Sequence, residues 1–252
     1  MDFAIIIQAR TGSTRFPKKI LKKIDHRSVL DYLIDSLLKI FSHKEIIIAT
    51  TNLKKDDKIK KIAQKKKVKF FRGSEKNVLK RYLDCSKKFK LQNIIHITSD
   101  CPLVDPSLIK KMKKIFILKK LDYFSNTNPP NKSRYPDGMD IEIYRYKSLL
   151  KLAKLTKLQE DKEHVTNFFW KNPNKFRTGI LKNNQNISNY KFSIDYKNDL
   201  ILVRKILEKI NQKKILPTSK NVVNIIKYNN KLKKISEISR QKYKKNRKDL
   251  FG

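Results

Sequence analysis

The sequence has few cysteines, no long apolar run and little negative charge. Its two cysteines, Cys85 and Cys101, cannot build a disulfide framework and do not form a pair with metal-ligand spacing, so both are interpreted as ordinary thiols. The only early apolar run, Phe3 to Ala9, has the length of a strand and leads directly into Arg10, which argues against a signal peptide or a membrane span there. We therefore expect a cytoplasmic protein without membrane insertion.

Acidic residues are outnumbered by basic ones, with 23 Asp and Glu against 61 Lys and Arg and a formal net charge of +38. Such a charge raises nucleic acid or an anionic membrane surface as a partner. Most of it is lysine spread between apolar helical positions, whereas arginine, which contacts phosphates and bases with fixed geometry, is scarce. The pattern favours a compositional bias, so no specific nucleic-acid partner is expected; a non-enzymatic nucleic-acid binder stays the alternative.

Strand-like and helix-like segments alternate from the start, which predicts an α/β fold with a largely parallel sheet covered on both faces. The expected strands are Phe3 to Ala9, Glu45 to Thr50, Val68 to Phe71, Asn93 to Thr98, Met139 to Tyr144, Phe176 to Leu181 and Lys191 to Ile194. We expect one domain, residues 1–230, followed by a basic stretch, residues 231–252, whose low apolar content predicts a solvated helix or a mobile tail.

A basic loop follows the first strand, at the edge of the sheet where ligands gather in a doubly wound fold. It contains Gly12 and four cations, which are Arg10, Arg15, Lys18 and Lys19. Gly12 lets backbone N–H groups approach an anion, while positioned guanidinium and ammonium groups neutralise charge as pyrophosphate leaves. The Gly-Lys-Ser/Thr order of a Walker loop is absent. The composition therefore suits phosphates, with a solvated basic turn as the alternative.

Two aspartates follow other expected strands. Asp100 comes directly after the strand that ends near Thr98, and Asp195 follows the short strand that ends at Ile194. Magnesium in proteins commonly uses one or two carboxylates together with substrate phosphates, so Asp100 is a natural Mg²⁺ ligand and Asp195 could supply the second carboxylate. The sequence alone does not show that the two converge. Asp199 is interpreted as a first-turn residue favoured by the helix dipole.

Asp140 and Glu142 lie two residues apart on an expected strand and hence on one face of it. Paired acids of this kind can bind sugar hydroxyls or a metal. The alternative, a polar and solvent-facing edge strand, is slightly favoured by the pattern alone. His96 alternates with apolar residues in a buried strand and is interpreted as structural.

Six runs of sequence stand out by their order along the chain. They are IIQARTGSTRFPKKIL, RGSEKNVLKRY, ITSDCPLVDP, RYPDGMDIEIY, EHVTNFFW and FSIDYKNDL, and they span Phe3 to about Ile210. Together they resemble the cytidylyltransferase family that includes CMP-sialate and CMP-3-deoxy-manno-octulosonate synthetases, and most of all its SpsF-like branch of spore-coat polysaccharide biosynthesis. The resemblance implies a nucleotide-diphospho-sugar transferase fold, Rossmann-like, with three α/β/α layers and a mostly parallel sheet. It also implies that CTP activates a sugar, in particular a sialic-acid-like or other keto-sugar acid, with release of pyrophosphate, for surface polysaccharide or glycan biosynthesis.

The resemblance further implies roles for particular residues. The nucleotide would be bound by Ala9, Arg10, Gly12, Ser13, Arg15 and Lys19, with Arg72, Gly73 and Val78 near the base. The catalytic residues would be Arg10, Lys19, Asp100 and Asp195, with Asp100 and Asp195 holding the Mg²⁺ cofactor. The sugar pocket would be bordered by Asp140, Glu142, Glu163 and His164. Lys18 stands where relatives usually carry glycine, so the turn is either more restricted or gains an extra phosphate contact.

Alternatives remain for the reaction and for two features of the chain. The same fold also suits a glycosyltransferase or a nucleotidyltransferase that uses another NTP. For His164, a capping or packing role is as open as a place beside a sugar carboxylate. Relatives are often dimers, so a homodimer is expected, and the sheet edge near Met139 to Tyr144 is one place where it could form.

Overall fold

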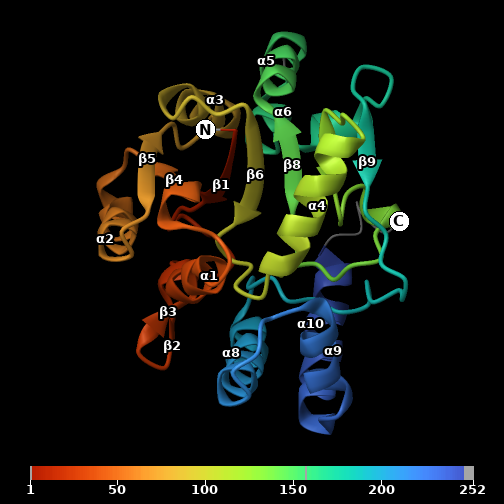
Figure 1. Ribbon diagram of the computed structural model, residues 1–252. Helices are drawn as coiled ribbons and strands as arrows, with labels where there is room; N and C mark the ends of the chain where they lie inside the picture. The colour runs from red at the N-terminus through yellow and green to blue at the C-terminus, as the bar shows by residue number, and fades with distance from the viewer. Residues whose placement is uncertain (1, 157, 247–252) are drawn as a thin grey trace.

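The computed structural model describes residues 2–156 and 158–246 and has a seven-stranded sheet at its centre (Figure 1). The strand order is β5-β4-β1-β6-β8-β7-β9, and every strand except β8 runs in the same direction. The strands are β1 (Phe3–Gln8), β4 (Ile46–Thr51), β5 (Lys69–Gly73), β6 (Asn93–Thr98), β7 (Tyr123–Ser125), β8 (Glu142–Arg145) and β9 (Thr178–Ile180), and a separate hairpin pairs β2 (Lys23–Ile24) with β3 (Arg27–Ser28). The α-helices are α1 (Val29–Leu38), α2 (Asp57–Lys65), α3 (Val78–Lys88), α4 (Pro106–Leu118), α5 (Tyr146–Leu155), α6 (Gln159–Glu163), α7 (Asn167–Lys171), α8 (Lys197–Gln212), α9 (Ser219–Lys227) and α10 (Asn230–Asn246).

Helices cover both faces of this sheet, and alternate residues of β1 belong to two different cores. Ile5 and Ile7 pack with residues of α1, α2 and α4, whereas Ala4 and Ile6 pack with residues of α3, α5 and α7. A central parallel strand buried on both faces is apolar throughout, which is why the run of residues 3–9 predicted it. Burial of one such isoleucine side chain contributes about 1.5–3 kcal/mol. The predicted three-layer α/β/α fold with a mostly parallel sheet is confirmed.

A third apolar core lies at the carboxyl end of the parallel strands, where α8, α9 and α10 pack together (Figure 1). It includes Val203 of α8, Val222 of α9 and Leu232 of α10, and it also takes in Phe192 and Ile194. Ile194 directly precedes Asp195, so this helical layer fixes the position of that aspartate.

Residues 231–246 are helical, as one of the two predicted alternatives, a solvated helix or a mobile tail, has it, but one face of the helix is buried. They form nearly all of α10, which contacts α8 and α9 and buries Leu232, Ser236, Ser239 and Tyr243. These residues recur every three or four positions, so one helix face is buried although two of its members are serines. Apolar content alone could not reveal that face. Residues 247–252 lie outside the described residues, and the boundary between domain and tail stays a prediction.

The segment expected to be an edge strand lies inside the sheet. β8 starts at Glu142 and pairs with β6 on one side and β7 on the other, and Glu142 is buried, so the interpretation as a solvent-facing edge strand is wrong for Glu142. Asp140 precedes the strand, so the two acids do not share one strand face as predicted. The edges of the seven-stranded sheet are β5 and β9, which also rules out Met139 to Tyr144 as a free edge for a dimer. Lys191 to Ile194 is not a strand either: its one sheet-like pairing is a single bridge between Asp137 and Lys191.

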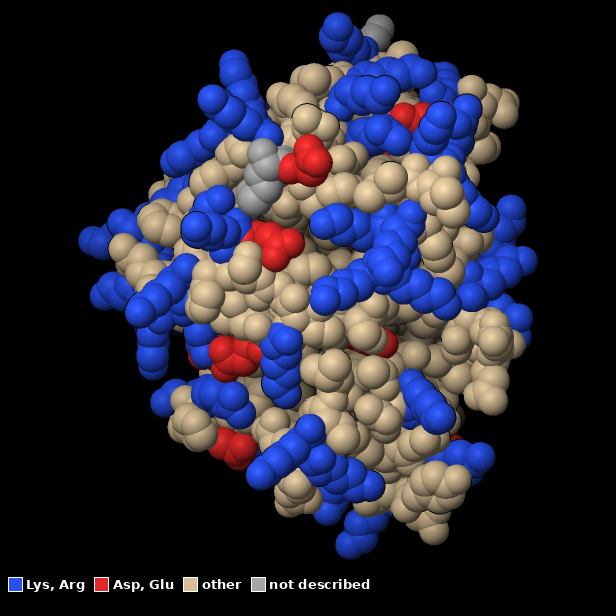
Figure 2. Space-filling view, viewed as in Figure 1, with Lys and Arg blue, Asp and Glu red and all other residues tan. Residues whose placement is uncertain are grey.

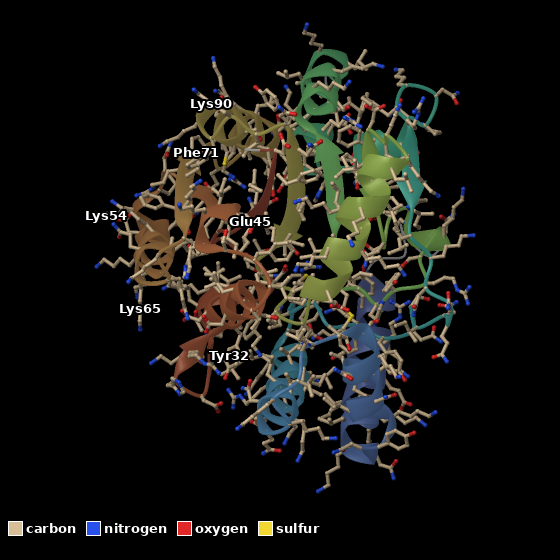
Figure 3. All side chains as sticks on the ribbon, in the orientation of Figure 1. Tyr32, Glu45, Lys54, Lys65, Phe71 and Lys90 are labelled. Atoms are coloured by element: carbon tan, nitrogen blue, oxygen red, sulfur yellow. The ribbon has the colours of Figure 1, made fainter. Side chains whose placement is uncertain are left out.

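Lysine covers the surface widely and does not gather in one patch of the visible face. Figure 2 shows Lys and Arg over most of that face with few acidic residues between them, and Figure 3 shows Lys54 and Lys65 extending outward beside α2. Lysine also occupies the left-handed position after helices, with φ of 54° at Lys67, 52° at Lys90 and 53° at Lys214. Glycine is the usual residue there, and a side chain costs about 1 kcal/mol. These features agree with a compositional bias toward lysine.

Among the described residues, no helix combines the length and the apolar character that crossing a bilayer requires.

Candidate active site

The loop after β1, residues 9–19, is called the cradle loop below. It leaves the sheet at the carboxyl edge, where the N–H of Ala9 still donates to the backbone of β4 at 3.1 Å. The loop closes on Thr11, whose carbonyl accepts from the N–H of Ser13 at 2.9 Å and of Lys18 at 3.2 Å. Lys18 is left-handed, with φ 55° and ψ 27°. Glycine adopts this conformation without steric cost, so the lysine keeps a glycine-type turn at a cost of about 1 kcal/mol.

A buried aspartate that the sequence did not single out braces the cradle loop. Asp56 is 0% exposed and accepts from the N–H of Thr11 at 2.8 Å and from its hydroxyl at 2.6 Å. Its other carboxylate oxygen accepts from the hydroxyl of Thr51, the last residue of β4. Hydrogen bonds to a carboxylate are about twice as strong as neutral ones. Asp56 therefore ties the start of the cradle loop to the neighbouring strand.

Lys19 lies between two aspartates that come from distant loops. Its ammonium donates to Asp100 and, at 3.0 Å, to Oδ1 of Asp195. Arg15 donates to the same Oδ1 at 2.8 Å. The backbone joins the two aspartate loops as well, because the N–H of Ile194 donates to the carbonyl of Asp100 at 3.0 Å. The structure thus brings Asp100 and Asp195 together, which the sequence alone could not show.

The charges at this point keep both partners ionised. Burial works to raise the pKa of Asp195, but the charges of Lys19, Lys191 and Arg15 outweigh it and lower the pKa to about 2. Burial works in the opposite direction on Lys19, and the charges of Asp100 and Asp195 outweigh it and raise its pKa. At neutral pH the site therefore contains a fixed ammonium between carboxylates.

Behind Asp195 lies the buried ammonium of Lys191, which sequence reasoning missed as a functional residue. Its Nζ donates to Oδ2 of Asp199 at 2.9 Å and to the carbonyl of Ser193 at 2.6 Å, and lies 3.5 Å from Oδ2 of Asp195. Oδ2 of Asp199 also accepts from the N–H groups of Asp195 and Tyr196, each at 2.9 Å. Asp199 is a first-turn residue of α8, as expected, and it also orients the backbone of Asp195.

The oxygens of Asp100 and Asp195 fit a hard divalent cation. They converge on one cationic group, and carboxylate oxygens are the protein ligands that magnesium prefers. Within residues 2–156 and 158–246, no three or more His, Cys, Asp or Glu side chains are grouped to hold a metal. A magnesium ion here would therefore use phosphate and water oxygens in its other positions, which is its usual arrangement with nucleotides. Magnesium stays a prediction.

Two smaller residues of the cradle loop lie beside this charged centre in the chain. Gly12 is exposed, and a Cβ at this position would meet only the flexible end of Lys55 at 3.3 Å and a carboxylate oxygen of Glu75 at 3.4 Å. Ser13 is half-buried, and its hydroxyl accepts from the N–H of Phe16 at 3.4 Å. For both residues, contact with a phosphate stays a prediction.

The three residues expected near a base lie around the start of α3. Arg72 donates to Asp57 at 2.6 Å and to the carbonyls of Thr51 and Leu53, each at 2.9 Å, so its guanidinium holds the loop after β4. Gly73 is buried, and Val78 is the buried first residue of α3. A Cβ on Gly73 would lie 3.0 Å from Cγ of Arg81. The structure gives Arg72 a bracing position, and contact with a base stays a prediction.

Glu163 meets the cradle loop across the site. Arg10 donates to it at 3.2 Å, with side chains 35% and 46% exposed. This pair brings a residue expected at the sugar pocket next to one expected at the phosphates. His164 is exposed and follows α6, where its backbone N–H donates to the carbonyl of Glu160 at 2.7 Å. This bond does not involve the imidazole, so the role of that side chain stays a prediction.

Glu142 is buried among partners from three segments. Its Oε1 accepts from the hydroxyl of Tyr123 and, at 2.9 Å, from the amide of Asn128, and its Oε2 lies 3.2 Å from Nδ1 of His96. Burial works to raise the pKa of Glu142, but the hydrogen bond and charge of His96, with the other donors, lower it. Asp140 is half-buried and accepts from the N–H of Gly138 at 2.7 Å; burial raises its pKa to about 7.

A family model described as cytidylyltransferase matches residues 4–233. The spore coat polysaccharide biosynthesis protein SpsF of Bacillus subtilis is 29% identical over 219 residues, which cover 84% of this chain and 89% of that protein. These matches confirm the resemblance carried by the six sequence runs.

Solved structures give the same result. A cytidylyltransferase from Leptospira borgpetersenii superposes with a TM-score of 0.85 at 29% identity and covers 94% of this chain and 97% of its own. CMP-2-keto-3-deoxy-manno-octonic acid synthetase, solved in complex with CTP, has a TM-score of 0.62 at 15% identity and covers 83% and 99% of the two chains. At that identity the second likeness shows the fold alone.

Proposed function

Because this chain belongs to the cytidylyltransferase family, we propose that it transfers the cytidylyl group of CTP to a hydroxyl of a sugar or sugar acid. The hydroxyl oxygen attacks the α-phosphorus, the bond between the α- and β-phosphates breaks, pyrophosphate leaves, and the hydroxyl proton is released. The product is a CMP-activated sugar. The observation that carries this proposal is the contact of Lys19, the last residue of the cradle loop, with both Asp100 and Asp195.

The cradle loop supplies positive charge where the triphosphate would lie. Lys19 and Arg15 are held in place by Asp195, so their charges are oriented before a ligand arrives. Preorganised cations at the leaving group are the main means by which enzymes accelerate such transfers. A bound triphosphate would exchange some of these ion pairs for its own, which frees the carboxylates of Asp100 and Asp195.

Those two carboxylates are the residues that would hold magnesium. When bound, the ion would neutralise developing charge on the phosphate oxygens. Lys191 and Asp199 support this function from behind, because they keep the carboxylate of Asp195 charged and its backbone fixed.

The acceptor is proposed to be a sialic-acid-like or other keto-sugar acid, and the product to serve surface polysaccharide or glycan biosynthesis. Arg10 supports an acidic acceptor, because its guanidinium lies at the boundary between the cradle loop and Glu163 and can pair with a sugar carboxylate. SpsF, the relative from Bacillus subtilis, carries the description of a spore coat polysaccharide protein. The proposed reaction belongs in the cytoplasm, where nucleoside triphosphates are made.

The test is a panel of the four NTPs against a set of sugars and sugar acids with magnesium, in which pyrophosphate release is measured. We expect release with CTP and a sugar acid in the wild type and a loss of at least about a hundredfold in Lys19→Gln, since one positioned charge contributes about 3 kcal/mol. Lys87→Gln, at an exposed position of α3, is the matched control and keeps full activity. Release with another NTP in preference to CTP, or release that Lys19→Gln leaves intact, would overturn the proposal.

A further inference from the structure

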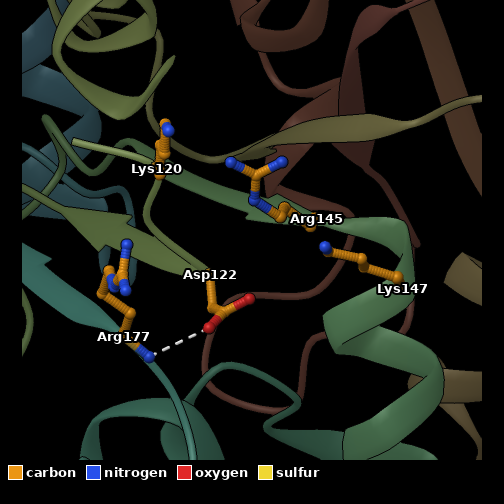
Figure 4. Close-up of a pocket in the computed structure, with 5 residues that line it drawn as sticks. All are labelled: Lys120, Asp122, Arg145, Lys147 and Arg177. Carbon is orange, nitrogen blue, oxygen red and sulfur yellow. Dashed lines mark hydrogen bonds between the residues drawn. The ribbon is translucent and has the colours of Figure 1, made fainter. Parts of the chain in front are cut away.

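A second basic site lies at the end of the sheet opposite to the cradle loop. Five residues line a cavity of about 500 Å³, called the basic pocket below: Lys120, Asp122, Arg145, Lys147 and Arg177 (Figure 4). Arg145 ends β8 and is in register with Asn93 at the start of β6, whereas the cradle loop lies beyond the other end of the parallel strands. The six residues of β6 place the two sites about 17 Å apart or more at 3.3 Å per residue.

The basic pocket has four cations and one carboxylate, and both oxygens of that carboxylate already accept hydrogen bonds from the protein. Oδ1 of Asp122 accepts from the hydroxyl of Ser148 at 2.5 Å, and Oδ2 accepts from the backbone N–H of Arg177 at 3.0 Å. Among the ion pairs of residues 2–156 and 158–246, none involves any of the four cations. Against four positive charges the lining has the one negative charge of Asp122, so the pocket has an excess of three positive charges (four minus one) that a multiply charged anion would neutralise.

The central guanidinium is fixed before any ligand binds. Nε of Arg145 donates to the carbonyl of Leu121 at 2.7 Å, and its Cζ lies 5.5 Å from the ring centre of Phe116. Figure 4 shows its two terminal nitrogens between the ends of Lys120 and Lys147. A guanidinium held in this way loses little conformational freedom when it binds an oxyanion.

The backbone around the pocket is also tied together. The N–H of Asp122 donates to the carbonyl of Arg177 at 2.8 Å, and the N–H of Arg145 donates to the carbonyl of Asp122 at 3.1 Å. Three of the lining residues thus share one hydrogen-bonded frame at the ends of β7, β8 and β9. Arginine is scarce in this lysine-rich chain, yet two arginines line this pocket, which the general bias toward lysine does not explain.

We propose that the basic pocket binds the phosphate group of a small molecule, at a site separate from the nucleotide site. The planar N–H donors of a guanidinium match the oxygens of a phosphate or diphosphate, and the lysines of the lining favour two or more negative charges. Two sources share this chemistry: free pyrophosphate and a sugar phosphate. The site does not depend on the proposed reaction.

The experiment uses the full chain with inorganic pyrophosphate or glucose 1-phosphate as the probe, and follows hydrogen exchange of backbone amides. We expect slower exchange at residues 120–123, 145–147 and 177–178 with at least one probe, apart from any effect at the cradle loop. The probe that binds more tightly at these residues shows whether the phosphate group comes from free pyrophosphate or from a sugar phosphate. In Arg145→Gln/Arg177→Gln, binding at these residues should weaken about tenfold or more, because two charge-assisted contacts are lost.

The matched control is Lys44→Gln/Lys87→Gln, which removes the same charge from two exposed positions elsewhere. It should bind as the wild type does. Equal weakening in the control, protection confined to residues 9–19, or no protection with either probe would overturn the proposal. If circular dichroism shows that the arginine variant does not fold, Lys120→Gln/Lys147→Gln replaces it, because both side chains are exposed and the same weakening is expected.

Discussion

Lys191→Met is expected to destabilise the protein strongly, because it removes a cation whose side chain is 0% exposed. It leaves behind Asp199 and Asp195, whose side chains are only 2% and 8% exposed. Breaking a buried ion pair by removing one partner costs about 3–5 kcal/mol, since the remaining charge stays away from water. Asp199 keeps two backbone donors at 2.9 Å, so the lower end, about 3 kcal/mol, is expected. For a chain of this size the melting temperature should fall by about 6–12 °C.

Urea unfolding followed by circular dichroism measures the free energy, and calorimetry measures the melting temperature. Lys220→Met, at an exposed position of α9, is the control and should change the free energy of unfolding by less than about 0.5 kcal/mol. Lys191→Met/Asp199→Asn removes the more deeply buried of these two carboxylate charges while keeping an acceptor for the backbone, and should recover about 1 kcal/mol or more. A cost below about 1 kcal/mol for Lys191→Met, or no recovery in the double variant, would show that this ammonium does not hold the aspartates in place.

Three further predictions concern other parts of the structure. Asp56→Ala leaves three buried donors without an acceptor, so the free energy of unfolding in urea should fall by about 3 kcal/mol or more and CTP should bind more weakly. A fall of less than about 1 kcal/mol would contradict the bracing of the cradle loop by Asp56. The pKa of Asp195 is about 2 in the fold against 3.8 ordinarily, so its carboxylate stabilises the fold above about pH 4, and this stabilisation is lost as the pH falls toward 2. In Asp195→Asn, the free energy of unfolding should therefore fall by about 2.5 kcal/mol less between pH 4 and pH 2 than in the wild type. The same pH profile in both proteins would refute the assignment. Gly138→Ala should lower the free energy of unfolding by roughly 2–5 kcal/mol, because φ is +90° and the new Cβ would lie 2.0 Å from the N of Ser193. Gly12→Ala should lower it by less than about 1 kcal/mol, because only side-chain atoms lie near the new Cβ. Similar melting temperatures for the two variants would contradict this reasoning.

Local sequence patterns predicted the parts of the fold whose cause is local. The apolar run at residues 3–9 and the run that became β6 (Asn93–Thr98) are buried on both faces, and their composition alone indicates that. β7 (Tyr123–Ser125) was missed because three residues are too few to show a period. Residues 191–194 resemble a strand because polar and apolar residues alternate, but all four are buried, and Lys191 is there because it binds carboxylates. A local sequence pattern can indicate that a segment is buried, but it does not show which residues its side chains contact.

The candidate site divides in the same way. Asp100 and Asp195 could be singled out because each follows an expected strand, and strand ends gather at one edge of a parallel sheet. Asp56 could not be singled out, because its role depends on Thr11, which lies far from it along the chain. Lys191 could not be singled out either, because no local pattern shows that its side chain is buried. Glu142 looked solvent-facing because its buried partners come from other segments.

Calorimetric titration of CTP, with and without magnesium, tests most directly whether Asp100 and Asp195 form a metal-assisted nucleotide site. In the wild type, we expect CTP to bind at least about tenfold more tightly with magnesium than without it. This difference should vanish in Asp100→Asn and in Asp195→Asn, because the loss of a metal ligand or of its support commonly weakens metal binding by about tenfold or more. CTP binding that magnesium leaves unchanged in the wild type, or a magnesium effect that survives in both variants, would contradict the assignment of these two aspartates.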